Sequence, residues 1–125
     1  MKLLHSMIRV KDIEKSLKFY QELLGLKLSR TMDLDDCKLY YLRDEITGVD
    51  IELTHNFETP ENGYEKGTQF GHFAFEVNSM EEFTQKLHAF GLEYSCEPFE
   101  IKAGLKIAFF EDPDGREIEI IEANT

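Results

Sequence analysis

The chain is poor in cysteine, in positive charge and in long apolar runs. Its 125 residues include two cysteines, Cys37 and Cys96, which stand far apart and form no CxxC pair. Two cysteines are too few to cross-link a small secreted domain and lack zinc-finger spacing, so reduced thiols in a cytoplasmic protein are expected. The apolar runs are too short for a signal peptide or a membrane helix, so no membrane association is expected.

Positive charge is scarce relative to negative charge. The chain has 14 Lys and Arg against 25 Asp and Glu, a formal net charge of -11. Nucleic acids and anionic membrane surfaces attract a surplus of Lys and Arg, so neither is expected as a partner. This average still allows a local basic pocket for an anionic small molecule.

What the chain does have is enough apolar material for a packed core. Hydrophobic residues make up 42% of it and aromatic residues 12%. At this length we expect one domain over residues 1–125, or two very small modules that pair closely.

The chain also repeats itself. Helical periodicity covers residues 12–25 and 79–91, with Asp12 and Ser79 placed as N-caps and a glycine at each end. One strand is predicted before each helix and three after it. The predicted strands cover 5–10, 26–32, 38–43 and 49–56 in the first half and 72–77, 92–98, 105–111 and 116–122 in the second. Two modules, 1–56 and 68–125, would be joined by a polar linker over 57–67.

The register of the repeat aligns two histidines and two glutamates. Glu52 follows His5 by 47 residues, and Glu119 follows His72 by the same 47. Each histidine lies in the first predicted strand of its half, and each glutamate lies in the last. Two halves that pair their sheets to bury a common core are related by a pseudo-two-fold axis, which would place the four residues as two equivalent pairs.

Taken singly, each of the four has an ordinary explanation. Glu52 alternates with apolar neighbours and is compatible with a solvent-facing position. Together, two imidazoles and two carboxylates suit a divalent transition metal with positions left open for water or substrate. The alternative that the four residues match by chance and lie on the surface without a shared role stays open. His55, of opposite parity to Glu52, and His88, on a helix without a carboxylate in matching register, are expected on the surface or in packing.

These residues resemble the glyoxalase I (lactoylglutathione lyase) family of the vicinal oxygen chelate superfamily, nearly end to end. The segment LLHSMIRVKDIEKSLKFYQELLGLKL resembles the opening strand and helix of that family. DIELTHN resembles its second-ligand strand, YEKGTQFGHFAFEV its third, and EDPDGREIEIIE its closing hairpin. The DPDG turn alone is common in the superfamily, whereas the His/Glu/His/Glu set is far more specific.

The resemblance implies a fold and a reaction. The fold is α+β, two paired βαβββ modules forming a cupped, barrel-like mixed sheet, in a swapped homodimer whose sites take ligands from both chains. The substrate is the hemithioacetal of methylglyoxal and glutathione, and the product is S-lactoylglutathione. The resemblance makes His5, Glu52, His72 and Glu119 the metal ligands. Proton transfer passes through an enediolate whose charge a divalent metal stabilises, with Glu119 as main base and Glu52 opposite it.

The resemblance also assigns substrate-binding residues and a metal. Arg9 and Asn56 match glutathione-contact positions, and Lys102 and Lys106 match a loop that closes over the glycine end of glutathione. The short chain groups with members activated by Ni²⁺ or Co²⁺, and together with His5 it points to Ni²⁺, although imidazole and carboxylate ligands also suit Zn²⁺, Co²⁺ or Mn²⁺.

Other functions on the same scaffold stay open. An isomerase similar to methylmalonyl-CoA epimerase usually carries Gln where Glu52 stands. Extradiol dioxygenases and thiol-transferring resistance enzymes use three ligands, which leaves Glu52 without a role. A glyoxalase that uses another thiol is a further alternative. A metal-free small-molecule binding module lacks the four residues and is less favoured.

Overall fold

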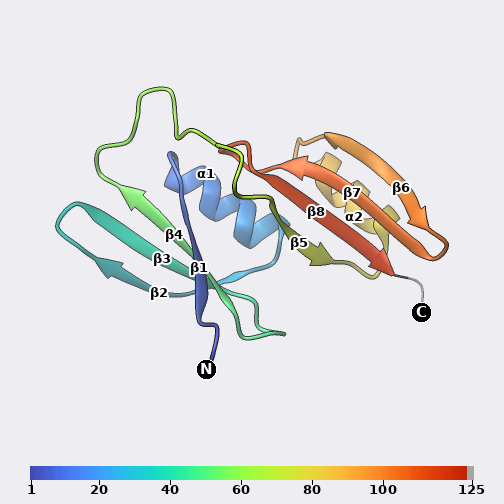
Figure 1. The fold of residues 1–125 in the computed structure, drawn as a ribbon, viewed down its shortest axis with the longest axis horizontal. Helices are drawn as coiled ribbons and strands as arrows, with labels where there is room; N and C mark the ends of the chain where they lie inside the picture. Colours follow the sequence, from blue (N-terminus) through green and yellow to red (C-terminus); the bar gives the residue numbers. More distant parts are fainter. Residues whose placement is uncertain (124–125) are drawn as a thin grey trace. The chain divides into compact units, whose positions relative to one another are not determined.

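The computed structural model describes residues 1–123 and divides the chain into two compact units, Met1–Glu65 and Lys66–Thr125. Figure 1 shows that each unit contains one sheet and helical segments of its own. The predicted single domain, with its modules 1–56 and 68–125 and its linker 57–67, stays a prediction. Residues 124 and 125 of the second predicted module lie outside the described residues.

The first unit forms a four-stranded mixed sheet. The strand order is β1-β4-β3-β2, in which β1 runs parallel to β4 and the other neighbours are antiparallel. The first and last strands of the unit are therefore hydrogen-bonded neighbours. The strands are β1 (His5–Arg9), β2 (Lys27–Asp33), β3 (Cys37–Arg43) and β4 (Asp50–Asn56).

The second unit repeats this topology. Its strand order is β5-β8-β7-β6, again with a parallel pair between the first and last strands. The strands are β5 (His72–Glu76), β6 (Cys96–Lys102), β7 (Leu105–Glu111) and β8 (Glu117–Ala123). The predicted order of strand, helix and three strands, the internal repeat and the α+β class are confirmed.

The helices begin where the sequence predicts. Asp12 accepts a hydrogen bond from the Lys15 N–H, and Ser79 accepts one from the Glu82 N–H, at 3.1 Å each. These bonds satisfy backbone donors that a helix start leaves unpaired. The helices are α1 (Ile13–Lys18) and α2 (Met80–Ala89).

The prediction of one regular helix over residues 12–25 is wrong in its second half. There α1 continues as a π-helical turn, η1 (Phe19–Leu23). The wider turn changes the direction of successive side chains, and Phe19, Tyr20 and Leu23 are all buried. Burial of these large apolar groups outweighs the local preference for a regular α-helix.

The predicted strand over residues 92–98 is also displaced, because β6 begins only at Cys96. Upstream of it, the Tyr94 hydroxyl bonds to the Thr84 hydroxyl on α2 at 2.7 Å. The Tyr94 ring is buried beside Phe110. The Tyr94 side chain therefore lies between α2 and Phe110 of β7, and the Ser95 N–H bonds to the Phe109 carbonyl just before regular pairing of β6 begins.

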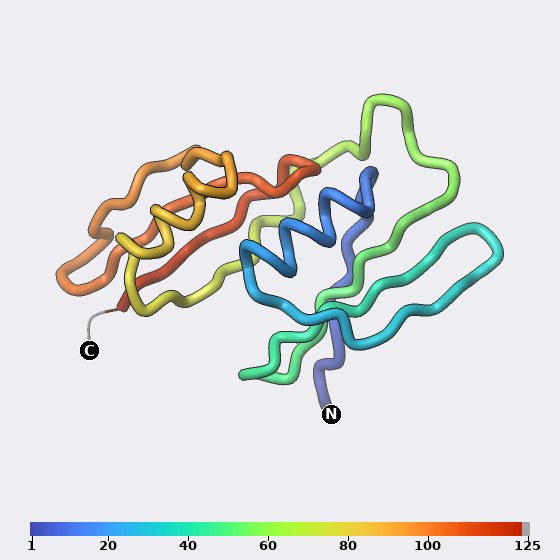
Figure 2. Tube along the Cα trace, turned by 180° about the vertical axis from the view of Figure 1, so that it is seen from behind, coloured from blue at the N-terminus to red at the C-terminus, as the bar shows by residue number. Residues whose placement is uncertain are grey.

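Each sheet buries one face against its own helical segment. In the first unit that face carries Ile8, Leu42 and Leu53; in the second it carries Phe110, Ile118 and Ile120, all buried. Phe83 of α2 lies 5.6 Å from Phe110, centroid to centroid. Figure 2 shows α2 lying across this face of the second sheet. The alternate residues of every strand point to the other face.

None of the helices within residues 1–123 is long and apolar enough to cross a membrane.

Candidate functional site

The parallel strand pair of the first unit brings His5 beside Glu52. His5 is paired in register with Asp50, and Glu52 lies two residues further along β4, on the same face. His5 Nε2 lies 3.4 Å from Glu52 Oε1. The imidazole is 37% exposed and the carboxylate side chain 9% exposed. The ring edge is thus accessible, whereas the carboxylate is nearly enclosed.

The second unit reproduces this arrangement. His72 is paired with Glu117, and Glu119 again lies two residues further along β8. His72 Nε2 lies 2.9 Å from Glu119 Oε1, with the two side chains 38% and 14% exposed. The equal sequence spacing of the two His–Glu pairs therefore corresponds to the same strand register in both sheets. The role of the four residues as metal ligands stays a prediction.

Glu52 sits among hydroxyl groups. The Thr54 Oγ1 hydroxyl donates a hydrogen bond to Glu52 Oε2 at 2.9 Å. Tyr41 faces Glu52 across the β3–β4 pair. A hydrogen bond to Glu52, burial and the charge of that carboxylate raise the pKa of the Tyr41 hydroxyl, while Arg30 opposes the rise. Glu52 is 7% exposed, so the solvent-facing alternative for this residue is wrong.

Aromatic rings flank both histidines. The His5 and Tyr41 rings meet edge to face at 5.6 Å and 78°, and the His72 and Phe109 rings meet at 5.4 Å and 86°. The Arg30 guanidinium carbon lies 3.8 Å from the Tyr41 ring centroid, a cation–π contact. Each histidine is thereby held in a similar orientation on its strand.

Sequence reasoning did not single out Tyr41, Thr54 or Arg30. A signal existed for Thr54, which shares strand parity with Glu52 at a distance of two residues. The two residues on β2 and β3 gave no signal, because the register between separate strands cannot be read from one sequence.

An ion pair between half-exposed Arg43 and buried Asp50 lies at the start of β4, next to His5. Arg43 Nε lies 2.9 Å from Asp50 Oδ1, and Arg43 Nη2 lies 3.2 Å from Asp50 Oδ2. This bidentate geometry raises the pKa of the Arg43 guanidinium. Asp50, which is paired in register with His5, therefore has its charge balanced by a guanidinium.

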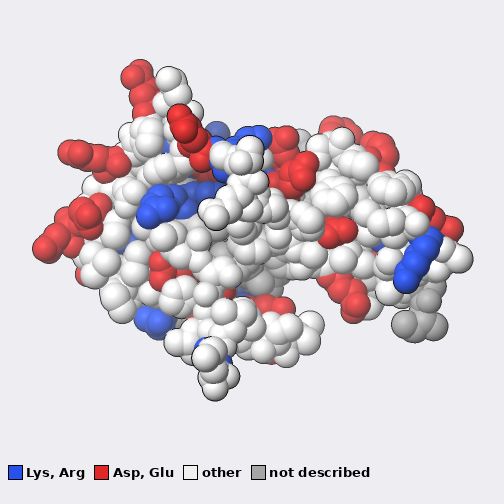
Figure 3. All heavy atoms as spheres, in the orientation of Figure 1, with Lys and Arg blue, Asp and Glu red and all other residues white. Residues whose placement is uncertain are grey.

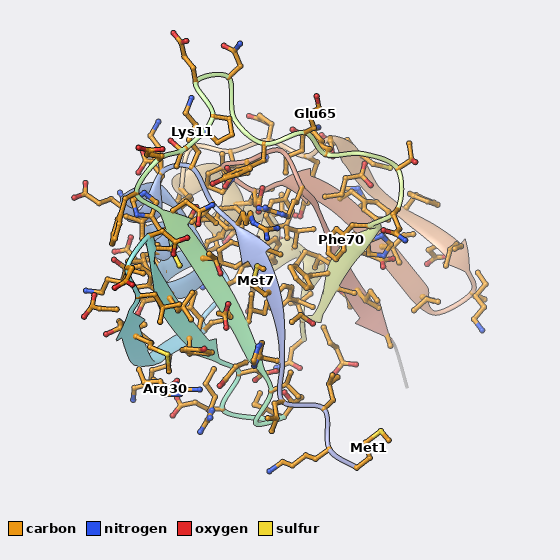
Figure 4. The ribbon with its side chains drawn as sticks, turned by 60° about the vertical axis from the view of Figure 1, so that its left-hand side comes forward. Met1, Met7, Lys11, Arg30, Glu65 and Phe70 are labelled. Carbon is orange, nitrogen blue, oxygen red and sulfur yellow. The ribbon has the colours of Figure 1, made fainter. Side chains whose placement is uncertain are left out.

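The predicted substrate-binding residues lie on several elements. Arg9 ends β1 on the face that carries His5, and Asn56 ends β4 on the face that carries Glu52. The Asn56 amide donates to the Tyr64 hydroxyl at 2.9 Å. Figure 4 shows Met7 on β1, where it is paired with Glu52.

Lys102 and Lys106 lie in strands rather than in the expected loop. Lys102 ends β6 and Lys106 is the second residue of β7. A tight turn joins them, with Gly104 at φ +79°. Glycine adopts this conformation without the strain that a side chain adds.

The two remaining histidines occupy other places. His55 is half-buried and is paired with Lys38 on the face opposite Glu52. His88 Nε2 lies 3.4 Å from Glu93 Oε2, and its ring packs edge to face on Tyr94. Glu93 is a carboxylate partner that the helical register did not reveal.

The donor chemistry of each pair fits a divalent transition metal. One imidazole nitrogen and one carboxylate oxygen lie 3.4 Å or less apart in each pair, so small side-chain adjustments would direct both toward one ion. Within residues 1–123, no three His, Cys, Asp or Glu side chains form a metal-holding group. Each unit therefore offers two candidate donors, and the predicted four-ligand site would need two such pairs.

The chain is acidic on average. Figure 3 shows Asp and Glu spread over both units, with Lys and Arg at fewer places on the face in view. With a net charge of -11, binding of an anion depends on local cations rather than on the average field.

Comparison with known proteins gives consistent matches. The pattern of the Glyoxalase/Bleomycin resistance protein/Dioxygenase superfamily matches residues 2–120. A lactoylglutathione lyase of Haemophilus influenzae is 40% identical over 98% of this chain and 93% of its own length.

Two solved structures are also similar. A glyoxalase I of Leishmania major, described as trypanothione-dependent, is 32% identical with a TM-score of 0.80, over 98% of this chain and 86% of its own. A mutant of glyoxalase I from Zea mays is 32% identical with a TM-score of 0.86, over 99% of this chain. The chain spans about half the length of the maize protein, 46%.

Proposed function

Because the chain belongs to the glyoxalase/bleomycin resistance/dioxygenase superfamily, we infer that it is a lactoylglutathione lyase. Its reaction is the isomerisation of the hemithioacetal of methylglyoxal and glutathione to S-lactoylglutathione, which detoxifies methylglyoxal. The observation that carries this inference is the repeated His–Glu pair, at 3.4 Å in one unit and 2.9 Å in the other. Relatives with the same activity in their names, identical at 40% over nearly the whole chain, support it.

The chemistry is a proton transfer between neighbouring carbons. Glu119 takes the proton from the carbon bonded to sulfur, and the electron pair moves toward the adjacent carbonyl to give an enediolate. The proton then returns to the second carbon, the hydroxyl proton on the first carbon's oxygen passes to the oxygen of the second carbon, and the first carbon becomes the thioester carbonyl. No atom is gained or lost. Glu119 suits this task because its carboxylate is 14% exposed and lies beside the site histidine.

We propose that His5, Glu52, His72 and Glu119 hold one divalent metal ion, Ni²⁺ in preference to Co²⁺ or Zn²⁺. The metal would supply Lewis-acid stabilisation of the negative charge on the two substrate oxygens. The edge exposure of both imidazoles, 37% and 38%, leaves room for such an ion.

Four further residues are proposed to bind the glutathione part. Arg9 and Asn56 lie on the same strand faces as His5 and Glu52, so a substrate at the site is within their reach. Lys102 and Lys106 flank one tight turn and offer two cations to a carboxylate.

We propose a homodimer in which each site takes His5 and Glu52 from one chain and His72 and Glu119 from its partner. Two equivalent half-sites in every chain are what such sharing needs. A cytoplasmic location is proposed as well, because Cys37 and Cys96 are both free thiols, as is common in reducing compartments.

A second candidate is the same isomerisation with a different thiol. The Leishmania major relative, described as trypanothione-dependent, is 32% identical to this chain. Epimerase-like chemistry and metal-free ligand binding are weaker alternatives, because neither function explains why Glu52 repeats the position of Glu119.

The test varies the metal ion and the thiol in one activity assay. The purified protein is stripped with a chelator, reloaded with Ni²⁺, Co²⁺ or Zn²⁺, and assayed for thioester absorbance with methylglyoxal and glutathione, trypanothione or another small thiol. We expect activity only after reloading, and highest with Ni²⁺ and glutathione. Absence of thioester with every metal and thiol would contradict the proposed function, and full activity of the stripped protein would contradict the metal requirement.

A further inference from the structure

We infer that the hydroxyl groups of Tyr41 and Thr54 hold Glu52 in one orientation, which makes Glu52 the fixed carboxylate and leaves Glu119 able to turn. The inference rests on the proposed function and adds two positioning residues to it. Its basis is a difference between the side chains around Glu52 and those around Glu119. The two units have the same strand topology, so the backbone does not account for this difference.

The Thr54 hydroxyl fixes one oxygen of Glu52. Thr54 Oγ1 donates to Oε2 at 2.9 Å, while Oε1 is the oxygen that faces His5. Both residues are buried, at 6% and 7% exposure. A buried carboxylate oxygen without a hydrogen bond is costly, so this bond favours one rotamer of Glu52 strongly.

Tyr41 is paired in register with Glu52 on the neighbouring strand, so its hydroxyl is directed toward the same carboxylate, which raises the pKa of the phenol. The phenol ring is itself held on two sides. Arg30, labelled in Figure 4, stacks its guanidinium 3.8 Å from the ring centroid, and the His5 ring meets it edge to face at 5.6 Å. A donor held this firmly keeps its acceptor in place.

The second unit has the same framework without the hydroxyls. Phe109 lies opposite Glu119 as Tyr41 lies opposite Glu52, and Ile121 stands two residues after Glu119 as Thr54 stands two after Glu52. The edge-to-face geometry of Phe109 on His72 is nearly that of Tyr41 on His5. The side chains of Phe109 and Ile121 have no polar atom, so neither can hold the carboxylate of Glu119.

This asymmetry matters for proton transfer between two carbons. A base that removes a proton from one carbon and returns it to the next must change its direction between the two steps. Rotation of Glu119 breaks no hydroxyl hydrogen bond, whereas rotation of Glu52 breaks the bond from Thr54 and turns the carboxylate away from Tyr41. The chain itself therefore distinguishes two carboxylates that the sequence repeat makes look equivalent.

The test measures metal binding separately from turnover. Tyr41→Phe, Thr54→Val and the double variant are titrated with Co²⁺ in the metal-free state, and the visible absorption of bound cobalt is recorded. We expect cobalt affinity to fall about 10–100-fold in the double variant, with an altered spectrum, because such supporting partners orient metal ligands. Thr54→Ser keeps the hydroxyl, so this variant should have the cobalt affinity and the spectrum of the parent. Tyr40→Phe, next to Tyr41 but on the opposite face of β3, is the matched control and should behave as the parent.

The reciprocal variant, Phe109→Tyr with Ile121→Thr, places two hydroxyls beside Glu119. We expect kcat to fall about tenfold or more, with KM and cobalt affinity near those of the parent, because a held base turns less readily. Parent-like cobalt affinity and spectrum in the Tyr41→Phe, Thr54→Val double variant would overturn the inference. A parent protein that binds cobalt but forms no thioester would overturn the proposed function alone, and one that binds no cobalt would overturn both.

Discussion

Glu52 and Glu119 occupy equivalent positions on β4 and β8, yet the groups around them differ in chemistry. Glu52 is enclosed by hydroxyls and is 9% exposed at its side chain, whereas Glu119 is 14% exposed and faces apolar neighbours. Two carboxylates of the same type can take different roles when their surroundings differ in this way.

The role of Glu119 as base can be tested by removing its basicity alone. Glu119→Gln keeps the shape of the side chain and one metal-binding oxygen, but an amide accepts no proton. We expect kcat to fall by about 10²–10⁴, the usual contribution of a general base, while metal content stays near that of the parent. Kinetics of the nickel-loaded variant together with metal analysis measure both quantities.

Glu97→Gln is the matched control, since Glu97 is exposed on the edge strand β6. It should retain the kcat of the parent. Substantial activity in Glu119→Gln with metal still bound would contradict the assignment of Glu119 as the base.

At the scale of elements, the packing of α2 depends on a buried phenol. Burial raises the pKa of Tyr94, against the opposing effect of its hydrogen bond with Thr84. The folded state therefore keeps the phenol protonated at pH values where the unfolded chain releases the proton. The stability due to this group is complete below pH 10, the ordinary pKa of a tyrosine in an unfolded chain, and is lost as pH rises through the higher folded pKa.

We expect Tyr94→Phe to remove part of the alkaline loss of stability. The parent should lose free energy of unfolding above pH 10 at a slope of up to about 1.4 kcal/mol per pH unit from this residue. Urea unfolding of both proteins between pH 8 and pH 11 measures the slopes. Equal slopes in the parent and the variant would show that Tyr94 does not titrate with unfolding.

The elements also show how far sequence alone reaches. The order of strands and helices, the caps at Asp12 and Ser79 and the spacing of the His–Glu pairs were predictable, because each depends on local pattern or on the repeat. The π-helical turn η1 and the late start of β6 were not, since both follow from tertiary packing of Tyr20 and Tyr94. The hydroxyl partners of Glu52 depend on strand register, which a single sequence does not contain.

At the scale of the whole molecule, the proposed sharing of sites between chains gives a mixing test. Glu52→Ala and Glu119→Ala should each be inactive as homodimers. If sites are shared, a mixed dimer of the two variants contains one intact site and one that lacks both glutamates. Equilibrated equal mixtures should then recover about a quarter of the parent activity, because half of the dimers are mixed and each has one working site of two.

Thioester formation is measured before and after the two variants are mixed and allowed to exchange chains. Chain exchange is confirmed separately with a tagged copy of one variant. Exchange without any recovery of activity would show that each site lies within one chain. Recovery is not expected when either variant is mixed with itself.

The parallel pairing of β1 with β4, and of β5 with β8, has a consequence for the order of folding. The antiparallel strands β2, β3 and β4 are joined by short turns, whereas β1 must find β4 across most of the unit. Contacts between residues distant in sequence form slowly, because the intervening chain must first be ordered. A partly folded unit with only its hairpins in place carries a glutamate without its histidine. If the pairs hold a metal as proposed, each half-site is completed by the step that closes its unit, so metal capture would follow folding instead of leading it.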